Sequence, residues 1–293
     1  MRTTLSLVHR NLSIYFRDRA GVFLSLLSAL ILLLLYTLFL GSLQIDNIQD
    51  SLPGASKGDI RAFVDSWVLA GIVMITTFTT GFGAMGVFVD DRVFERFKDF
   101  QVAPIRRHQL ILGYQGAAFV VASIMSLAIL ILGGVLLVIM HSSQIISWVG
   151  VVQAVGYVLL LSLAFSALSS FILTFVGSSA AYTAVSTIVG TLLGFLAGAY
   201  LPVGLLSGPV RNAINCLPFS PAAMLLREPL VGPSRDVLAG GVSQASTALD
   251  SYYGFTLSVG SATLTAPIAI IALGCIAVIF TVLGSLRIGR VLR

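Results

Sequence analysis

Three acidic residues at helical spacing are the strongest candidate for chemistry in this sequence. Asp91, Glu95 and Asp99 stand at positions i, i+4 and i+8, so a helix through them would carry all three carboxylates on one face. Carboxylate oxygens are the ligands that hard cations such as Mg²⁺ prefer. The spacing therefore allows a Mg²⁺ site of the kind that could hold a diphosphate group.

Neighbouring residues offer a simpler interpretation of these acids. Membrane prenyltransferases hold Mg²⁺-diphosphate with two Asp-rich motifs, whereas this chain has one such cluster. Arg92, Arg96 and Lys98 lie beside the acids, where they can form local salt bridges. The three His are scattered, and Cys216 and Cys275 are too far apart in the sequence to indicate a metal site. We therefore expect neither a catalytic site nor a bound metal.

The overall composition places these charges in a membrane protein. Hydrophobic residues make up 57% of the 293 residues, charged residues only 10%, and the mean hydropathy is +1.00. A soluble domain carries roughly 25% charged residues, and a soluble domain of this size could not bury so much apolar surface. Long apolar runs are typical of helical spans and not of β-barrels. We predict an all-α polytopic membrane protein with a single transmembrane domain over residues 1–293.

Charge-free runs divide the chain into six predicted spans. About 20 apolar residues cross a bilayer core of about 30 Å. The longest run without Asp, Glu, Lys or Arg covers residues 109–210, and it must fold back at the softer stretches 140–148 and 177–181. The predicted spans are residues 21–43, 66–89, 110–140, 148–176, 182–205 and 263–286.

The distribution of Lys and Arg predicts the orientation. With the N-terminus inside, the cytoplasmic segments hold 12 of the 17 Lys and Arg residues. This bias follows the positive-inside rule, so both termini are expected in the cytoplasm. Residues 1–19 carry Leu5, Val8, Leu12 and Tyr15 at helical spacing, which predicts an amphipathic helix that lies in the membrane interface.

Two segments near the fifth and sixth spans have distinctive compositions. Residues 206–262 combine five Pro with apolar stretches, which favours short re-entrant or interfacial helices on the outer side. Arg227 is expected to be structural there, because a lone Arg on such a helix more often caps carbonyls than selects cargo. Gly190, Gly194 and Gly198 repeat at every fourth residue, which predicts close packing on a helix of the same chain or of a second copy.

The charged segment between the second and third spans has the pattern of an amphipathic helix. Val93, Phe97 and Phe100 fall at i, i+4 and i+7, and charged residues cover the rest of the surface. The helix is expected to end before Pro104. Two interpretations stay open: a docking helix for a cytoplasmic partner, or a loop helix whose charges only set the topology.

The absence of ionisable residues from the predicted spans, and of a phosphate-binding loop from the sequence, excludes several classes of transport protein. The predicted spans contain no Asp, Glu, Lys or Arg, which argues against a carrier coupled to protons or Na⁺ and suits apolar or amphipathic cargo. No G-x-x-x-x-G-K-[ST] loop occurs, so another subunit would have to bind ATP if ATP drives this protein. The net charge of +5 is assigned to the membrane surface and not to nucleic acid.

The order of these features resembles the ABC-2 family of exporter permeases, in particular its drug- and toxin-export branch. The residues that carry the resemblance are Glu95, Arg96, Asp99, Pro104, Ile105, Arg106, Arg107, Gly113, Leu201, Pro202, Leu217, Pro218 and Arg227. Each motif is loose, but their order and spacing across the whole chain are specific. Many relatives read Glu-x-Gly-Thr where this chain reads Phe94-Glu95-Arg96-Phe97, which indicates a docking surface matched to its own partner.

The resemblance implies a division of labour between subunits. Two copies of this chain, or this chain and a similar one, would form the membrane domain within the lipid. Two copies of a separate ATP-binding cassette protein would bind ATP and Mg²⁺, so this chain itself would hold no cofactor. Residues 90–103 would be the coupling helix. Its expected contacts with the ATP-binding subunit are Val93, Phe94, Glu95, Arg96, Phe97, Lys98 and Asp99.

The implied function is export of a drug, toxin or lipid-like molecule across a bacterial plasma membrane. Residues 206–262 would form the outer gate, with Pro202, Pro218 and Arg227 as its structural residues, and the glycine repeat could lie at a dimer seam. A polysaccharide or teichoic-acid permease is one alternative, although 18 of the 28 aromatic residues are Phe, which favours lipid-like or drug-like cargo. The other alternative is the prenyltransferase-like enzyme, which would act with Mg²⁺ and without ATP.

Overall fold

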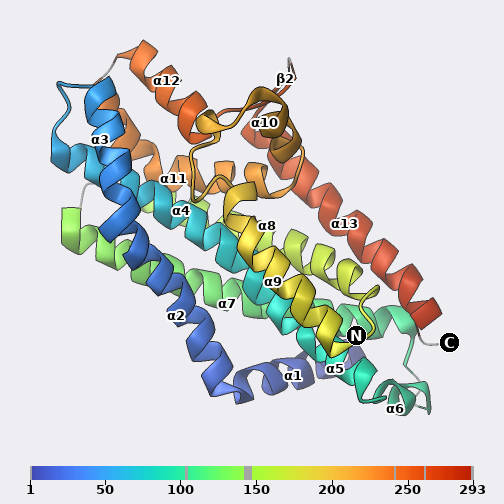
Figure 1. Cartoon of the computed structure of the whole chain (residues 1–293). Helices are drawn as coiled ribbons and strands as arrows, with labels where there is room; N and C mark the ends of the chain where they lie inside the picture. The colour runs from blue at the N-terminus through green and yellow to red at the C-terminus, as the bar shows by residue number, and fades with distance from the viewer. Residues whose placement is uncertain (1, 103–104, 142–146, 241, 261, 292–293) are drawn as a thin grey trace.

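Long helices connect the two ends of the molecule in the computed structural model, which describes residues 2–102, 105–141, 147–240, 242–260 and 262–291 (Figure 1). Six helices of these residues are long and apolar enough to cross a membrane. They cover Arg19–Phe39, Lys57–Val93, Arg107–His141, Trp148–Leu173, Ser179–Leu196 and Ala266–Ile288. The predicted all-α polytopic class is therefore confirmed.

The elements fall into three groups along the length of the molecule (Figure 1). The end that we call the charged end contains α1 (Arg2–Arg17), α5 (Gly86–Val93) and α6 (Phe97–Val102). The long helices are α2 (Arg19–Leu35) with its continuations η1 (Tyr36–Leu40) and α3 (Gly41–Ser51), α4 (Lys57–Ala84), α7 (Arg107–His141), α8 (Trp148–Leu173), α9 (Ser179–Leu196) and α13 (Ala266–Val291). The opposite end contains η2 (Val203–Leu205), α10 (Gly208–Asn215), α11 (Phe219–Ala239), α12 (Ser243–Tyr253), β1 (Leu257–Val259) and β2 (Ala262–Leu264).

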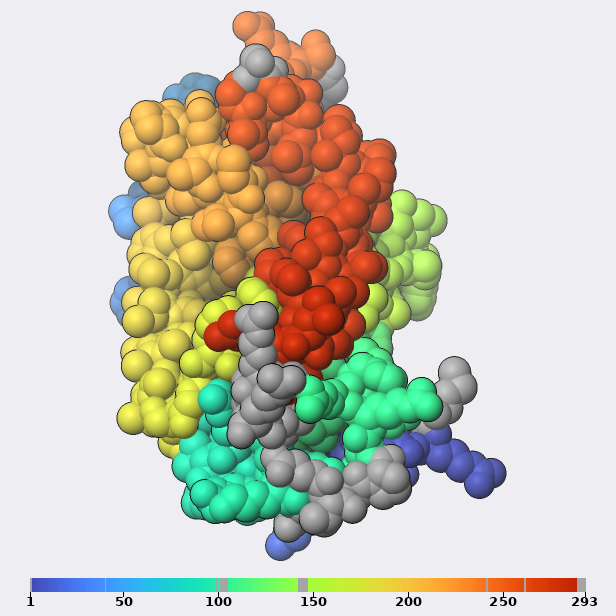
Figure 2. All heavy atoms as spheres, turned by 90° about the vertical axis from the view of Figure 1, so that its right-hand side faces the viewer, coloured from blue at the N-terminus to red at the C-terminus, as the bar shows by residue number. Residues whose placement is uncertain are grey.

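Helix α4 forms the centre of the fold. Of its most apolar stretch, 83% is buried within the chain, against 17% for α2, 11% for α9 and 17% for α13. A helix that is hydrophobic all round must be covered all round, and α4 packs against α7, α8 and α11. Helix α13 lies on the outside, where Figure 2 shows it covering much of one face of the molecule.

Two glycines bring neighbouring segments close to α4. A Cβ atom on Gly133 of α7 would lie 2.2 Å from Cδ1 of Leu69, so a larger residue there would have to move the Leu69 side chain. A Cβ atom on Gly71 of α4 would lie 2.5 Å from the Cβ atom of Ala199, which follows α9. Small residues of this kind allow helices in a membrane to approach closely and gain van der Waals contact.

Helix α4 begins nine residues before the predicted start of the second span at residue 66. The side chain of Ser56 caps it by accepting a hydrogen bond from the backbone N of Asp59 at 3.1 Å. Asp65, which the sequence division left outside the spans, therefore lies inside a helix that can cross the membrane. Its buried carboxylate contacts Nε2 of His141 at 2.8 Å.

Residues 206–262 are more regular than the short helices that we predicted. Helices α10 and α12 are short, but α11 has 21 residues although Pro229 and Pro233 lie inside it. A Pro inside a helix costs about 3 kcal/mol. Most of α11 is buried against α4 and α8, and burial of one large apolar side chain contributes about 1.5–3 kcal/mol, so the summed burial offsets that cost.

The predicted glycine face of the fifth span is not formed. Helix α9 ends at Leu196, and Gly198 follows it with φ = +61°, the left-handed conformation that terminates many helices. A Cβ atom on Gly194 would lie 2.1 Å from the ring of Tyr200, and one on Gly190 would meet nothing within 4 Å. Gly194 therefore packs on its own chain, and Gly190 keeps open space beside α9.

The packing predicts a position-dependent cost of enlarging glycine. Gly71→Val should lower the free energy of unfolding by about 1–3 kcal/mol, because overpacking of a filled interior costs this much. Gly156→Val is the matched control, since a Cβ atom there would meet nothing within 4 Å. The thermal midpoints of the two purified variants in one detergent provide the measurement. Equal losses in both variants would contradict the close contact of Gly71 with Ala199.

Candidate functional site

The charged segment after α4 folds as two short helices around a tight turn. Helix α5 ends at Val93, α6 begins at Phe97, and Glu95 between them has φ = 58°. A left-handed backbone is uncommon for a residue other than glycine. The prediction of one helix over 90–103 is therefore wrong, and Asp91 and Glu95 do not share a helix face.

Burial of Phe97 accounts for the break. In one continuous helix its ring would lie on a stripe with Val93. The turn instead places this ring against Phe88 and Tyr114, with centroid distances of 5.3 and 6.3 Å, and leaves Phe97 only 6% exposed. Burial of a Phe side chain contributes about 1.5–3 kcal/mol, which is comparable to the cost of about 1–3 kcal/mol for a left-handed residue.

Asp91 is the buried anchor of the charged end. Its carboxylate accepts hydrogen bonds from Nη1 and Nη2 of Arg10 at 2.6 and 3.0 Å. It also accepts one from Nη1 of Arg96 at 3.0 Å and one from the hydroxyl of Tyr114 at 2.5 Å. The bonds to Asp91 raise the pKa of Arg10 above its ordinary value, which keeps this cation charged. One carboxylate thus joins α1, α5, the turn and α7.

Helix α1 covers most of the predicted interfacial segment and is fixed against α7. A Cβ atom on Gly113 would lie 2.6 Å from the Cβ atom of Leu7, and one on Gly116 would lie 2.8 Å from Cγ2 of Val8. The two glycines of α7 therefore form the surface on which α1 rests. Leu5, which we placed on the apolar stripe, is 74% exposed.

Arg92 connects α5 to the end of α8. Its Nη1 atom donates to the carbonyl oxygens of Thr174 at 3.3 Å and Val176 at 2.8 Å. These carbonyls follow Leu173, the last residue of α8, where the negative end of the helix dipole favours a cation. Helix α5 is therefore attached to α8 in addition to α1 and α7.

The structure separates the residues predicted to contact an ATP-binding subunit into two groups. The exposed residues are Val93, Phe94, Glu95, Arg96 and Lys98, and the buried residue is Phe97; the guanidinium of Arg96 nevertheless reaches inward to the carboxylate of Asp91. Phe94 is 64% exposed, and Glu95 forms an ion pair with Lys98. The side chain of Asp99 and residues 103 and 104 lie outside the described residues.

At the opposite end, Arg227 is fully buried on α11. Its Nη1 atom donates to the carbonyl oxygen of Gly254 at 2.9 Å. Its Nη2 atom donates to those of Ala197 at 3.0 Å and Gly198 at 2.8 Å. The guanidinium also lies 5.5 Å from the ring of Trp67. Arg227 therefore holds the turn after α9 and the turn after α12 against the central helices.

Two glycines make the approach to Arg227 possible. Gly198 and Gly254 have φ values of 61° and 75°, and a Cβ atom on Gly254 would lie 2.4 Å from Nη1 of Arg227. Burial lowers the pKa of Arg227 to about 9, and the three carbonyls offset part of this loss of solvation. Pro202 and Pro218 stand directly before η2 and α11, so they mark the beginnings of these two helices.

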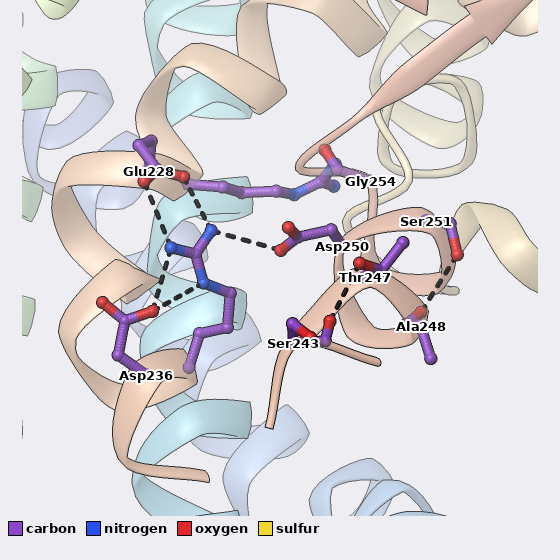
Figure 3. Close-up of polar contacts among 10 residues, drawn as sticks. Glu228, Asp236, Ser243, Thr247, Ala248, Asp250, Ser251 and Gly254 are labelled. Carbon is purple, nitrogen blue, oxygen red and sulfur yellow. Dashed lines mark hydrogen bonds and ion pairs between the residues drawn. The ribbon is translucent and has the colours of Figure 1, made fainter. Parts of the chain in front are cut away.

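A second Arg of α11 fixes α12, and the sequence analysis missed it. Nη1 of Arg235 lies 3.0 Å from Glu228 and 3.1 Å from Asp250, and Nη2 lies 3.0 Å from Asp236 (Figure 3). Asp250 belongs to α12, so this contact depends on how the chain turns between the two helices. Residue spacing within one helix cannot predict a contact between Arg235 and Asp250, because the two residues lie on different helices.

The contacts of Asp91 are those of an ion-pair network. The oxygens of Asp91 are occupied by Arg10, Arg96 and Tyr114, so the three-acid face that Mg²⁺ would need is missing. In the described part of the chain, no group of three or more His, Cys, Asp or Glu residues could hold a metal ion. What the charged end provides is an exposed turn whose base is bonded to several helices.

Comparison with known proteins gives one family. Residues 2–230 match the model of the ABC-2 type transporter, which is 229 of the 293 residues. The matched region includes α1, the charged turn and the part of α11 that carries Arg227. No curated protein matches the chain.

The bonds of Asp91 predict that substitution of Asp91 and of its neighbour Asp90 will have very different effects on stability. Asp91→Ala should lower the free energy of unfolding by about 3 kcal/mol, because it leaves Arg10 and Arg96 without their carboxylate. Asp90→Ala should change it by less than about 0.5 kcal/mol, as surface substitutions usually do. Unfolding of the purified variants tests this. Similar stabilities of the two variants would contradict the role of Asp91.

The opposite end predicts a similar dependence on Arg227. Arg227→Met should cost at least about 3 kcal/mol, since three buried carbonyls lose their donor and each unsatisfied group costs about 1–3 kcal/mol. Arg227→Lys should recover only part of this loss, because an ammonium lacks the planar fork of the guanidinium. Thermal unfolding and protease cleavage between α11 and α12 provide the readouts. Full recovery by Lys would contradict the three-carbonyl arrangement.

Proposed function

Because the chain belongs to the ABC-2 type transporter family, we propose that it is the permease subunit of an ATP-driven exporter. Members of this family are membrane transport subunits, and they generally work with an ATP-binding cassette partner. One observation carries the proposal: an exposed turn at the charged end is bonded at its base to three other helices.

The exposed turn has the chemistry of a docking surface. Phe94 presents a large aromatic side chain to solvent, and Glu95 and Lys98 place opposite charges beside it. Exposed aromatic residues often become the centre of a protein interface, where a few side chains supply most of the binding energy. The charge pair would orient the partner and discriminate against others.

The bonds beneath the turn provide a route for force. Arg96 connects the turn to Asp91, which connects to α1 through Arg10 and to α7 through Tyr114. Arg92 adds the connection to α8. A partner that moves the turn during its ATP cycle would therefore move α1, α7 and α8 together. ATP and Mg²⁺ bind in the partner in this mechanism.

The outer helices favour a second copy of the permease. The most apolar stretches of α2, α9 and α13 are at most 17% buried within the chain. Apolar helix surfaces of this kind are not exposed to water. They therefore face either the lipid chains or the apolar surface of another permease. Two permeases, identical or different, would pair with two ATP-binding subunits, and amphipathic or hydrophobic cargo would pass along their seam.

The charge distribution supports the location. The charged end contains α1, α5 and α6, and α13 returns the chain to the same end (Figure 1). The Lys and Arg bias assigns this end to the cytoplasm. We propose a plasma membrane of a bacterial cell, with both termini inside and the elements of residues 203–264 at the outer gate.

Purification from the native membrane in mild detergent tests the subunit composition. We expect a protein with Mg²⁺-dependent ATPase activity to copurify with the tagged chain in equal number. A clean permease without ATPase activity, obtained from membranes that transport cargo, would contradict the proposal.

Coupling should depend on the exposed residues of the turn and not on general packing. A variant with Phe94→Ala and Glu95→Gln should reduce transport at least about tenfold, since central interface residues contribute 2 kcal/mol or more. The ATPase activity of the partner should persist without coupling to transport. Phe23→Ala, an exposed Phe in the first span, is the matched control and should transport normally. Normal coupling in the double variant would remove the turn from the mechanism.

A further inference from the structure

A cavity of about 510 Å³ opens at the charged end, where α1 turns into α2. Its walls come from α1, α2, α4, α5 and α9, all of which reach the lower end of the molecule in Figure 1. Ligand sites in proteins typically have volumes of about 300–1,000 Å³. The cavity is therefore large enough for a small organic molecule.

Two carboxylates on different helices line this cavity. Asp18 caps the first turn of α2 by accepting a hydrogen bond from the backbone N of Gly21 at 3.0 Å, and Asp90 lies on α5. In the described ranges of the chain, neither carboxylate forms an ion pair. Arg10 and Arg92 are bonded elsewhere, and Arg17 and Arg19, which flank Asp18 in the sequence, form no ion pair with it in these ranges. The cavity therefore has two carboxylates in its wall that no ion pair of the described residues neutralises.

The remaining walls suit a cation that also has an apolar body. Tyr15 and Tyr182 contribute aromatic rings, which attract cations over their faces. Tyr182 is held in place, because its ring stacks on Phe82 with a centroid distance of 5.9 Å and its hydroxyl donates to the carbonyl oxygen of Gly83 at 3.3 Å. Ile14, Val22 and Val87 add apolar surface.

Gly86 shows that the position of Tyr182 is specific. A Cβ atom on this residue of α5 would lie 2.8 Å from the Tyr182 hydroxyl, so a larger residue would require this side chain to shift. Helices α4, α5 and α9 thus meet at this point with a glycine under the aromatic wall. The wall is a packed feature of the fold.

We propose that this cavity binds organic cations with an apolar body and is the site where such cargo is loaded. Binding of a cation is inferred from the cavity alone, whereas transport of that cation as cargo rests on the proposed exporter function. The cavity lies beside α2 and α9, two of the least buried spans, so a molecule dissolved in the adjoining leaflet can reach it. Its position at the charged end places it on the same side as the docking turn.

A phosphatidylethanolamine headgroup also carries an ammonium group and is the competing source of this chemistry. Its phosphate would bring a negative charge close to Asp18 and Asp90. Like charges at short distance repel, so a simple cation fits the cavity better than a zwitterionic headgroup. The cargo assignment is therefore favoured, and the lipid is an outcome to be tested.

Equilibrium binding to the permease without its ATPase partner tests the proposal. The protein would be placed in phosphatidylcholine nanodiscs, with empty nanodiscs subtracted, and titrated with tetraphenylphosphonium. Tetraphenylborate, which has the same shape and the opposite charge, is the matched ligand control. We expect saturable binding of the cation, weaker binding at high salt because screening reduces charge attraction, and no saturable binding of the anion.

Charge removal identifies the two residues. Asp18→Asn keeps the helix cap, because Asn and Asp cap equally well, and Asp90→Asn changes a side chain with no hydrogen bond to lose in the described structure. Each variant should weaken binding about three- to fivefold and the double variant about tenfold or more, as expected for partly exposed charge pairs. Asp46→Asn, an exposed acid on α3, is the control and should leave binding unchanged.

Three results would overturn the proposal. The double variant, shown to be folded by its unfolding midpoint, could bind the cation as tightly as the unchanged protein. Tetraphenylborate could bind equally well. Nanodiscs that contain phosphatidylethanolamine could lose cation binding through the same two acids, which would make the site a lipid site. If no ATPase copurifies with the chain from native membranes while the purified permease still binds the cation, the exporter function would be overturned and the cavity assignment would stand.

Discussion

The buried carboxylate of Asp91 is the constraint on which the charged end depends. A carboxylate without solvent or a partner would cost several kcal/mol, and here Arg10, Arg96 and Tyr114 all reach it. To supply these donors, α1 must lie across α7 and the chain after α5 must turn inward. The turn in the left-handed conformation at Glu95 follows from this requirement and from the burial of Phe97. The same turn leaves the ring of Phe94 outside, where a partner can reach it.

The two ends of the molecule use opposite charges for the same purpose. At the charged end, one buried acid gathers cations from separate elements. At the opposite end, one buried cation, Arg227, gathers carbonyl oxygens from two turns that end in glycine. Between them, α4 is mostly apolar and packs through small residues such as Gly71, although it also buries polar groups such as Asp65, which contacts His141. Both ends are thus fixed by a few polar contacts, while close packing of side chains holds most of the middle.

Adjacent acids on α5 have separate roles because successive residues of a helix point in different directions. Asp91 faces the interior and is neutralised by its partners. Asp90 faces the cavity at the α1–α2 corner, where Asp18 adds a second charge and Tyr182 adds an aromatic wall. The docking turn begins after the end of this same helix. A short helix therefore links the proposed cation site with the surface that we propose for the ATP-binding partner.

The sequence by itself determined the class of the protein, its six apolar helices, the charged segment after the second span and the family, because run length, charge distribution and motif order are local properties of the chain. It also singled out Arg227 and Glu95 as notable residues. Only the tertiary structure decided that Asp91 pairs with Arg10, which lies 81 residues away, that the helix over 90–103 breaks at Glu95, and that Gly198 ends α9. Each of these depends on a neighbour brought close by folding, and helical spacing carries no information about such neighbours.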